Sequence, residues 1–172
     1  MTTLVVGGAA SGKSEWAETL LMQQAAHQRI YIATMQVWDE ECRQRVNRHR
    51  AMRAEKAFET LEAPLGLLQA AQKVPADSAV LLEDITNLCA NEMFDVQGAG
   101  KNACPEILAG VQVLAEKCAA LVIVSGDTAS GGSEYEGETL AYLKTLEKIN
   151  NALAQRADCV YEAVAGMLVR HK

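Results

Sequence analysis

The sequence contains few aromatic residues, few prolines and no long apolar run. Of its 172 residues, 5% are Phe, Trp or Tyr and 3 are proline. No stretch approaches the roughly 20 consecutive apolar residues that a transmembrane helix needs, so we expect no membrane span. Positive charge is also in the minority, because 16 Lys and Arg face 22 Asp and Glu and give a net charge of −6. This balance argues against a protein that coats nucleic acid.

The cysteines lack the spacing of a zinc site or a disulfide framework. They are odd in number and widely separated, with no Cys-x-x-Cys pair, whereas zinc sites cluster cysteine and histidine at short spacing. We therefore expect reduced, structural thiols and a cytoplasmic protein. The glycine-rich motif that starts at Gly7 leaves no room for a signal peptide and supports the same expectation. The cysteines are Cys42, Cys89, Cys104, Cys118 and Cys159.

Short apolar runs alternate with helical patterns along the chain. Such alternation indicates a mostly parallel sheet with helices on both faces, an α/β fold. The last two strands are separated only by Ala165 and Gly166, so we expect an antiparallel hairpin at one edge. We predict a single domain over residues 1–172, with a short helix started by Pro64. The expected strands are 4–6, 29–33, 58–62, 79–82, 120–125, 158–164 and 167–169, and the expected helices are 13–26, 39–53, 64–73, 105–118 and 138–156.

Residues 7–14 fit the phosphate-loop pattern G-x-x-x-x-G-K-[ST] between a predicted strand and a predicted helix. The glycines let backbone N–H groups turn toward an anion, and the helix dipole adds positive potential. Lys13 would reach the β- and γ-phosphates, and the Ser14 hydroxyl would bind Mg²⁺. The pattern predicts a nucleoside triphosphate site in a P-loop NTPase-like (RecA-like) domain. Its residues are Gly7, Gly8, Ala9, Ala10, Ser11, Gly12, Lys13 and Ser14.

A carboxylate at the end of a neighbouring strand is the second part of such a site. Glu83 and Asp84 follow the predicted strand 79–82 directly. An acidic residue at a strand end is common, but beside a phosphate loop it favours a role with the metal. We therefore expect Glu83, together with Ser14, to be a Mg²⁺ ligand.

Five of the eight arginines lie between Arg43 and Arg53. In a helix, Arg45, His49 and Arg53 would share one face. Neighbouring cations would keep the His49 imidazole neutral, and arginine forks bind phosphate oxygens. A neutral histidine in that setting is a candidate nucleophile toward phosphorus. The charge pattern alone leaves a second interpretation open, a solvated basic helix with a surface histidine.

Four segments follow, in order, the pattern of one known family. They are residues 4–14 with the phosphate loop, the strand 31–34, the stretch 45–64 with RVxxHRxxR and FxTxExP, and the stretch 81–91 with LLExxT and Asn91. Together they resemble the bifunctional adenosylcobinamide kinase / adenosylcobinamide-phosphate guanylyltransferases of cobalamin biosynthesis. The clear match covers residues 1–95, and beyond it only 149–150 and 157–158 remain similar.

The resemblance implies two reactions and their substrates. His49 would attack the α-phosphate of GTP, release pyrophosphate and pass GMP to adenosylcobinamide phosphate. A nucleoside triphosphate, GTP or ATP, would phosphorylate adenosylcobinamide with Mg²⁺ as cofactor. The resemblance also implies a homo-oligomer, a trimer, that binds a corrinoid. The charge balance described above leads us to expect no nucleic-acid partner. The residues implied to bind the nucleotide beyond the phosphate loop are Ala33, Thr34, Met35, Arg50, Arg53, Glu62 and Glu83.

Two other hypotheses stand beside this one. The first is a plain small-molecule kinase in which the arginines clamp phosphates and His49 is idle, and the second is a non-catalytic, nucleotide-binding regulator. Only the guanylyltransferase would trap nucleotide covalently on His49. The chain also departs from the family pattern, since Ala10 stands where arginine is usual and Asp84 where a cysteine or small residue is usual.

Overall fold

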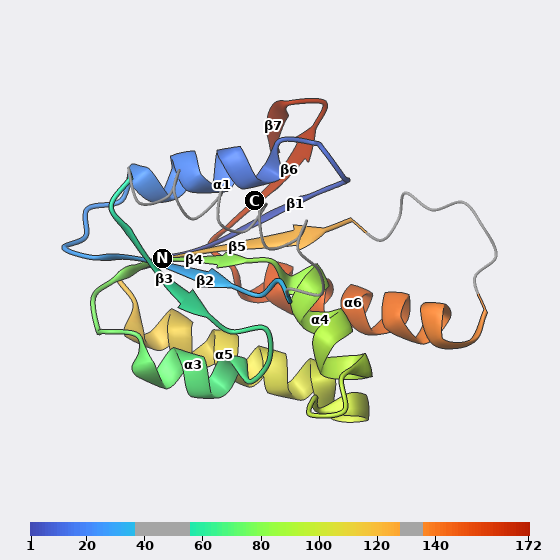
Figure 1. Ribbon diagram of the computed structural model, residues 1–172. Helices are drawn as coiled ribbons and strands as arrows, with labels where there is room; N and C mark the ends of the chain where they lie inside the picture. The colour runs from blue at the N-terminus through green and yellow to red at the C-terminus, as the bar shows by residue number, and fades with distance from the viewer. Residues whose placement is uncertain (37–55, 128–135) are drawn as a thin grey trace.

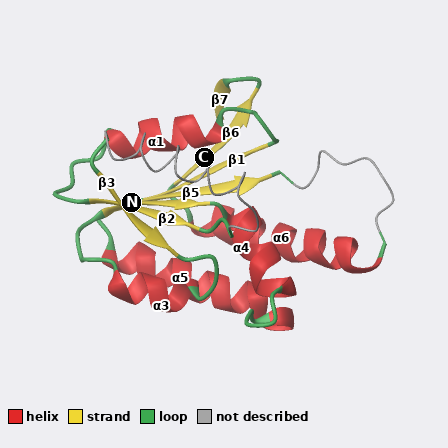
Figure 2. Cartoon of the chain, viewed as in Figure 1, coloured by secondary structure: helices red, strands yellow, loops and turns green. Residues whose placement is uncertain are grey.

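In the computed structural model, which describes residues 1–36, 56–127 and 136–172, seven strands form one sheet (Figures 1 and 2). The order across the sheet is β3-β2-β4-β5-β1-β6-β7. Every neighbouring pair is parallel except β6 and β7, which are antiparallel. The strands are β1 (Thr2–Gly7), β2 (Arg29–Ala33), β3 (Phe58–Glu62), β4 (Ala79–Glu83), β5 (Ala120–Gly126), β6 (Cys159–Val164) and β7 (Met167–Arg170).

The predicted edge hairpin is confirmed. Ala165 and Gly166 connect β6 to β7, and both have positive φ, 48° and 79°. Two-residue turns with positive φ at both positions match the twist of the strands that they join. The turn therefore allows β7 to pair antiparallel to β6 at the end of the sheet.

Helices cover both faces of the sheet, as predicted. Figure 1 shows α1 on one face of the sheet and α3, α4, α5 and α6 on the other. None of the helices in the described ranges is long and apolar enough to cross a membrane. The helices are α1 (Lys13–Met22), α3 (Leu67–Lys73), α4 (Ile85–Phe94), α5 (Ala103–Lys117) and α6 (Gly137–Arg156), with a short 3₁₀ helix, η1 (Gly100–Asn102).

The core lies in two layers because successive side chains of a strand point to opposite faces. In β4, Leu82 packs into the cluster under α3, α4, α5 and α6, whereas Leu81 packs into the cluster under α1. Ile123 and Val122 divide in the same way in β5. All four are almost fully buried. Continuous apolar strands, rather than alternating ones, are what a sheet covered on both faces requires.

Two helix limits differ from the sequence prediction by three residues or more. The helix α1 ends at Met22 rather than at residue 26, because the chain turns back to begin β2 at Arg29. The helix α3 begins at Leu67, so the expectation that Pro64 starts it is wrong. The residue before α3, Gly66, has left-handed backbone angles (φ 65°, ψ 48°), which no helix continues through. The predicted helix 39–53 lies outside the described residues.

The helix α4 was not predicted. It follows Asp84, whose Oδ1 accepts a hydrogen bond of 2.7 Å from the backbone N–H of Asn87. An aspartate in extended conformation that accepts this bond is a standard helix N-cap. Asp84 therefore starts a helix as well as standing beside Glu83 at the end of β4.

Candidate nucleotide-binding site

The phosphate loop joins β1 to α1 at the carboxyl edge of the sheet, so the strand and helix predicted to flank it are both present. Gly12, the residue before α1, has φ 87°, a conformation that favours glycine. The Lys13 ammonium folds back over the loop and donates to the carbonyl of Gly8 at 3.2 Å. The loop thus places a flexible cation above exposed backbone at the positive end of a helix, the arrangement that binds phosphates.

Gly7 and Ser11 show how tightly the loop is packed. A Cβ atom on Gly7 would lie 2.5 Å from Ser11 Oγ and 2.7 Å from the carbonyl oxygen of Ala163, so only glycine fits there. The Ser11 hydroxyl is buried and has no hydrogen-bond partner among the residues that the structure describes. An unpartnered buried hydroxyl costs about 1–3 kcal/mol, and an oxygen-rich ligand in the loop would supply the missing acceptor.

Glu83 links the phosphate loop to the second half of the site. The Ser14 hydroxyl donates to Glu83 Oε1, and the Tyr31 hydroxyl donates to Oε2 at 2.9 Å. The predicted pair of Ser14 and Glu83 is therefore in direct contact, although β5 separates β1 from β4 in the sheet. A hydroxyl and a carboxylate are the oxygen donors that a hard cation prefers.

Burial is the largest influence on the Glu83 carboxyl and raises its pKa above the ordinary value of 4.5. The hydrogen bonds from Ser14 and Tyr31 oppose this rise. The negative charges of Asp84 and Glu18 add to it. Burial also raises the pKa of Asp84 above 3.8. Adjacent carboxylates that are costly to ionise make the site favourable for a bound cation.

Thr34 and Asn91 tie together the carboxyl ends of three strands. The fully buried Thr34 donates its N–H to the carbonyl of Glu83 at 3.0 Å. Its hydroxyl donates to the Asp84 carbonyl at 2.8 Å and accepts from the Asp84 N–H at 2.7 Å. The Asn91 amide donates to the carbonyls of Thr34 and Pro64, at 2.8 and 2.9 Å. These bonds fix β2, β3 and β4 relative to one another where the predicted nucleotide residues lie.

Several residues predicted to bind the nucleotide are in register at this edge of the sheet. Ala33, the last residue of β2, is in register with Glu62 of β3 on one side and with Glu83 of β4 on the other. Thr34 and Met35 follow directly. Sequence reasoning assigned no role to Tyr31 and Asn91. A tyrosine in an otherwise apolar strand was the signal for the first, because its hydroxyl needs a partner when buried.

His49, Arg50 and Arg53 lie outside the described residues, and their roles stay predictions. The same holds for Cys42. The other four cysteines are free. Burial raises the pKa of Cys89 to about 12 and that of Cys118 to about 11, so both thiols are held in the unreactive protonated form.

Comparison with known proteins identifies the family. The model of the family described as cobinamide kinase / cobinamide phosphate guanyltransferase matches residues 3–171. The chain belongs to this family. The bifunctional adenosylcobalamin biosynthesis protein CobU of Salmonella typhimurium is 31% identical over 100% of both chains. The corresponding protein CobP of Pseudomonas aeruginosa is 30% identical over 97% of this chain and 95% of its own.

Solved structures confirm the predicted P-loop NTPase-like fold of this cobinamide kinase / guanyltransferase family member. The KaiC-like protein of Pyrococcus horikoshii superimposes with a TM-score of 0.52 at 10% identity, over 94% of this chain and 71% of that chain. The flagellar accessory protein FlaH of Methanocaldococcus jannaschii gives 0.50 at 14% identity, over 97% and 74%. At these identities the likeness shows the fold alone.

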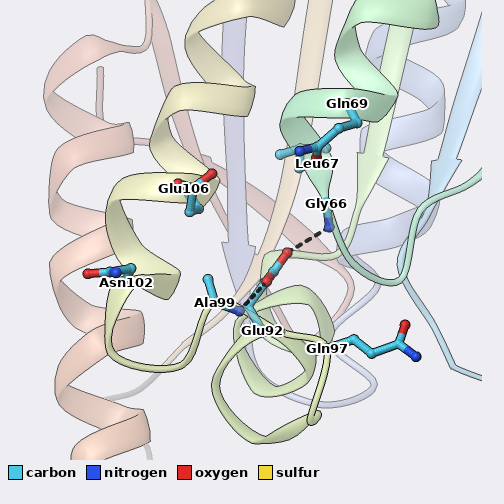
Figure 3. Close-up of a pocket in the computed structure, with 9 residues that line it drawn as sticks. Gly66, Leu67, Gln69, Glu92, Gln97, Ala99, Asn102 and Glu106 are labelled. Atoms are coloured by element: carbon cyan, nitrogen blue, oxygen red, sulfur yellow. Dashed lines mark hydrogen bonds between the residues drawn. The ribbon is translucent and has the colours of Figure 1, made fainter.

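A pocket of about 290 Å³ lies beside the site, between the starts of α3 and α5 (Figure 3). Its centre is Glu92, which is 4% exposed. Glu92 Oε1 accepts from the N–H of Gly66 at 2.7 Å, and Oε2 accepts from the N–H of Ala99 at 2.9 Å. Because both oxygens bind backbone, Glu92 braces the loop after α4 against the β3–α3 connection. The pocket is lined by Gly66, Leu67, Gln69, Glu92, Gln97, Gly98, Ala99, Asn102 and Glu106.

We predict that Glu83→Gln stabilises the protein at high pH when divalent cations are absent. The folded protein holds the Glu83 proton more tightly than the unfolded chain does. Stability is therefore lost as the pH rises through a window that begins at the ordinary pKa of 4.5. Glutamine stays neutral and avoids this loss. Urea unfolding in EDTA at about pH 4 and about pH 8 should show a gain only at the higher value.

The control is Glu147→Gln, which changes an exposed carboxylate of α6 and should leave both values unchanged. An equal pH dependence of the unfolding free energy in the wild type and in Glu83→Gln would contradict the prediction.

We also predict that Glu92→Ala lowers the free energy of unfolding by about 2–4 kcal/mol, since it leaves two backbone N–H groups without their acceptor. Glu106→Ala removes an exposed carboxylate from the same pocket and should change stability by less than about 0.5 kcal/mol. Chemical denaturation measures both. Similar small effects for the two variants would show that Glu92 is no brace.

Proposed function

We propose that this chain carries out two transfers on a corrinoid precursor. The first is phosphorylation of adenosylcobinamide by a nucleoside triphosphate. The second is transfer of GMP from GTP to adenosylcobinamide phosphate, which gives adenosylcobinamide-GDP. The observation that carries the proposal is the contact between Ser14 and Glu83 beside a phosphate loop, in a chain of the cobinamide kinase / guanyltransferase family.

In the kinase step, the phosphate loop would hold the β- and γ-phosphates. The N–H groups at the start of α1 and the Lys13 ammonium supply positive potential where negative charge grows. The Ser11 hydroxyl is available as a further donor. The cobinamide hydroxyl oxygen bonds to the γ-phosphorus and loses its proton to water. The bond from that phosphorus to the β-phosphate oxygen breaks, and the nucleoside diphosphate leaves.

Ser14 and Glu83 fit Mg²⁺. They offer two oxygen donors in contact, and burial of Glu83 makes its charge favourable to neutralise. Bound Mg²⁺ would offset the negative charge of the triphosphate. Tyr31 holds the second carboxylate oxygen of Glu83, so the carboxylate keeps one orientation toward Ser14.

For the guanylyl transfer, the family resemblance points to His49. An imidazole nitrogen of His49 would bond to the α-phosphorus of GTP while the bond to the β-phosphate oxygen breaks and pyrophosphate leaves. A phosphate oxygen of adenosylcobinamide phosphate would then bond to the same phosphorus, and the N–P bond would break and restore the imidazole. Arg50 and Arg53 would offset the charge at phosphorus. Ala33, Thr34, Met35 and Glu62 would contact the nucleotide.

We expect a covalent GMP adduct on the wild type and none on His49→Asn after incubation with Mg-GTP. In the proposal the His49 imidazole is the only protein group that bonds to the α-phosphorus, and asparagine cannot replace it. Intact-protein mass spectrometry, together with an assay for released pyrophosphate, measures the adduct. His27→Asn changes an exposed histidine outside the site and should keep the adduct.

An adduct that persists in His49→Asn would identify another nucleophile. No adduct in the wild type at any pH would remove the guanylyltransferase and leave the plain kinase. Transfer of label from the γ-phosphate of ATP or GTP to adenosylcobinamide then tests the kinase by itself. No transfer in either assay would leave the non-catalytic, nucleotide-binding regulator.

We further infer a homo-oligomer, a trimer, that acts in the cytoplasm. Apolar side chains on the β6–β7 hairpin support association, since Val164, Met167 and Val169 are 44%, 63% and 44% exposed. Light scattering should give three times the chain mass of 18.6 kDa. A monomer mass at working concentration would contradict the trimer, and recovery in a membrane fraction would contradict the location.

A further inference from the structure

The turn between β6 and β7 lies against the phosphate loop, although its Gly166 is 150 positions from Trp16 of α1 in the sequence. The N–H of Gly166 donates to the carbonyl of Ser11 at 3.1 Å. The carbonyl of Gly166 accepts from the indole Nε1 of Trp16 at 2.9 Å. Both backbone groups of Gly166 are thus bonded to the loop and to the helix that follows it. Neither of the two proposed transfer reactions involves this contact.

We propose that Trp16 is a positioning residue for the phosphate loop. Through Gly166 it holds the loop in the backbone conformation that binds the triphosphate. This proposal rests on the triphosphate site of the proposed function. It names the residue that keeps that site in shape.

The loop needs such support because its backbone is unusual on both sides of Ser11. Ala10 has φ 54° and Gly12 has φ 87°, both in the left-handed region. For a residue with a side chain, such as Ala10, this conformation is unfavourable because Cβ comes close to a neighbouring carbonyl oxygen. Residues in sparsely populated conformations persist only where surrounding contacts hold them. The hydrogen bond from Gly166 to Ser11 is such a contact, between these two positions.

The same bond determines where a neighbouring N–H group points. The carbonyl of Ser11 and the N–H of Gly12 belong to one trans peptide group, so they point in opposite directions. A carbonyl held toward the turn therefore directs the Gly12 N–H away from the turn. Backbone N–H groups that point into the loop are what binds an anion there.

Trp16 completes the contact from the helix side. It lies in the first turn of α1, which also carries Lys13 and Ser14. Its bond to Gly166 joins that turn of helix to the residue that holds Ser11. The hairpin supports the other end of the loop as well, because β1 pairs with β6 and Gly7 is in register with Ala163. The phosphate loop is therefore held at both ends by the hairpin.

The experiment compares Trp16→Phe with Thr19→Val, which removes a side-chain hydrogen bond of the same helix, from the Thr19 hydroxyl to the carbonyl of Glu15. Isothermal titration with the magnesium complex of the non-hydrolysable ATP analogue AMP-PNP should show an affinity about 3- to 10-fold weaker for Trp16→Phe, the effect of one neutral hydrogen bond. Thr19→Val should match the wild type. Amide exchange by NMR should be faster at Gly166 in Trp16→Phe alone.

A local role in the loop differs from a general loss of stability in its exchange pattern. Faster exchange should be confined to Gly166 and the loop, while amides of β4 keep their wild-type rates. Unchanged affinity with unchanged exchange at Gly166 would overturn the proposal, and so would weaker binding with uniform exchange across the sheet. If Trp16→Phe does not fold, replacing Trp16 by benzothienylalanine, in which sulfur stands for the indole N–H, removes the hydrogen bond and keeps the shape.

Failure of the proposed function gives a different result. Wild-type protein that binds no AMP-PNP and no GTP would remove the triphosphate site itself. Gly166 exchange would then decide the role of Trp16 alone, because faster exchange in the variant would still show that the indole holds the turn against the loop. Unchanged exchange would overturn that role too.

Discussion

The hydrogen-bonded Glu83 carboxylate is the contact on which the site depends. It accepts from Ser14 on the phosphate-loop helix and from Tyr31 on β2, so it joins two parts of the sheet that are not neighbours. Its burial makes its charge unfavourable without a cation. The same burial makes the carboxylate a strong cation ligand once the phosphates arrive. The ionised carboxylate is therefore least favourable when no cation is bound, as expected of a group that serves function rather than stability.

Around Glu83, the arrangement is stiff because polar side chains bind backbone. Thr34 holds both the N–H and the carbonyl of Asp84, and Asn91 bonds the ends of two strands. Glu92 does the same for the loop after α4. Bonds of this kind set the spacing between strand ends more tightly than apolar packing does, since a hydrogen bond fixes distance and direction. The predicted nucleotide residues thus sit on a rigid edge.

Much of the fold and of the phosphate site could be predicted from the sequence, because the signals lie in short continuous segments. The phosphate loop is a continuous motif, and the buried strands are continuous apolar runs, so both are visible without a structure. The contact of Ser14 with Glu83 followed from the rule that carboxyl ends of parallel strands share one edge. The edge hairpin followed from a two-residue gap.

What the sequence left hidden depends on distant partners. Tyr31 and Asn91 became meaningful only when the fold placed Glu83, Thr34 and Pro64 beside them. The helix α4 was missed although its cap, Asp84, is a recognised start signal, because the acidic pair was interpreted as a metal site alone. The prediction that Pro64 starts α3 was wrong, because the hydrophobic pattern does not indicate the left-handed backbone of Gly66, which lies between Pro64 and the helix.

The contact between Gly166 and Ser11 has a consequence for the order in which the protein matures. The phosphate loop leaves the ribosome before the turn that holds it, which is translated about 150 residues later. The strand β1 also pairs with β6 on one side. The growing chain therefore contains the whole phosphate-loop sequence before it contains Gly166, which bonds to the loop. The loop gains its bond from Gly166 only when the hairpin has formed, so full nucleotide affinity requires the part of the chain that is translated later.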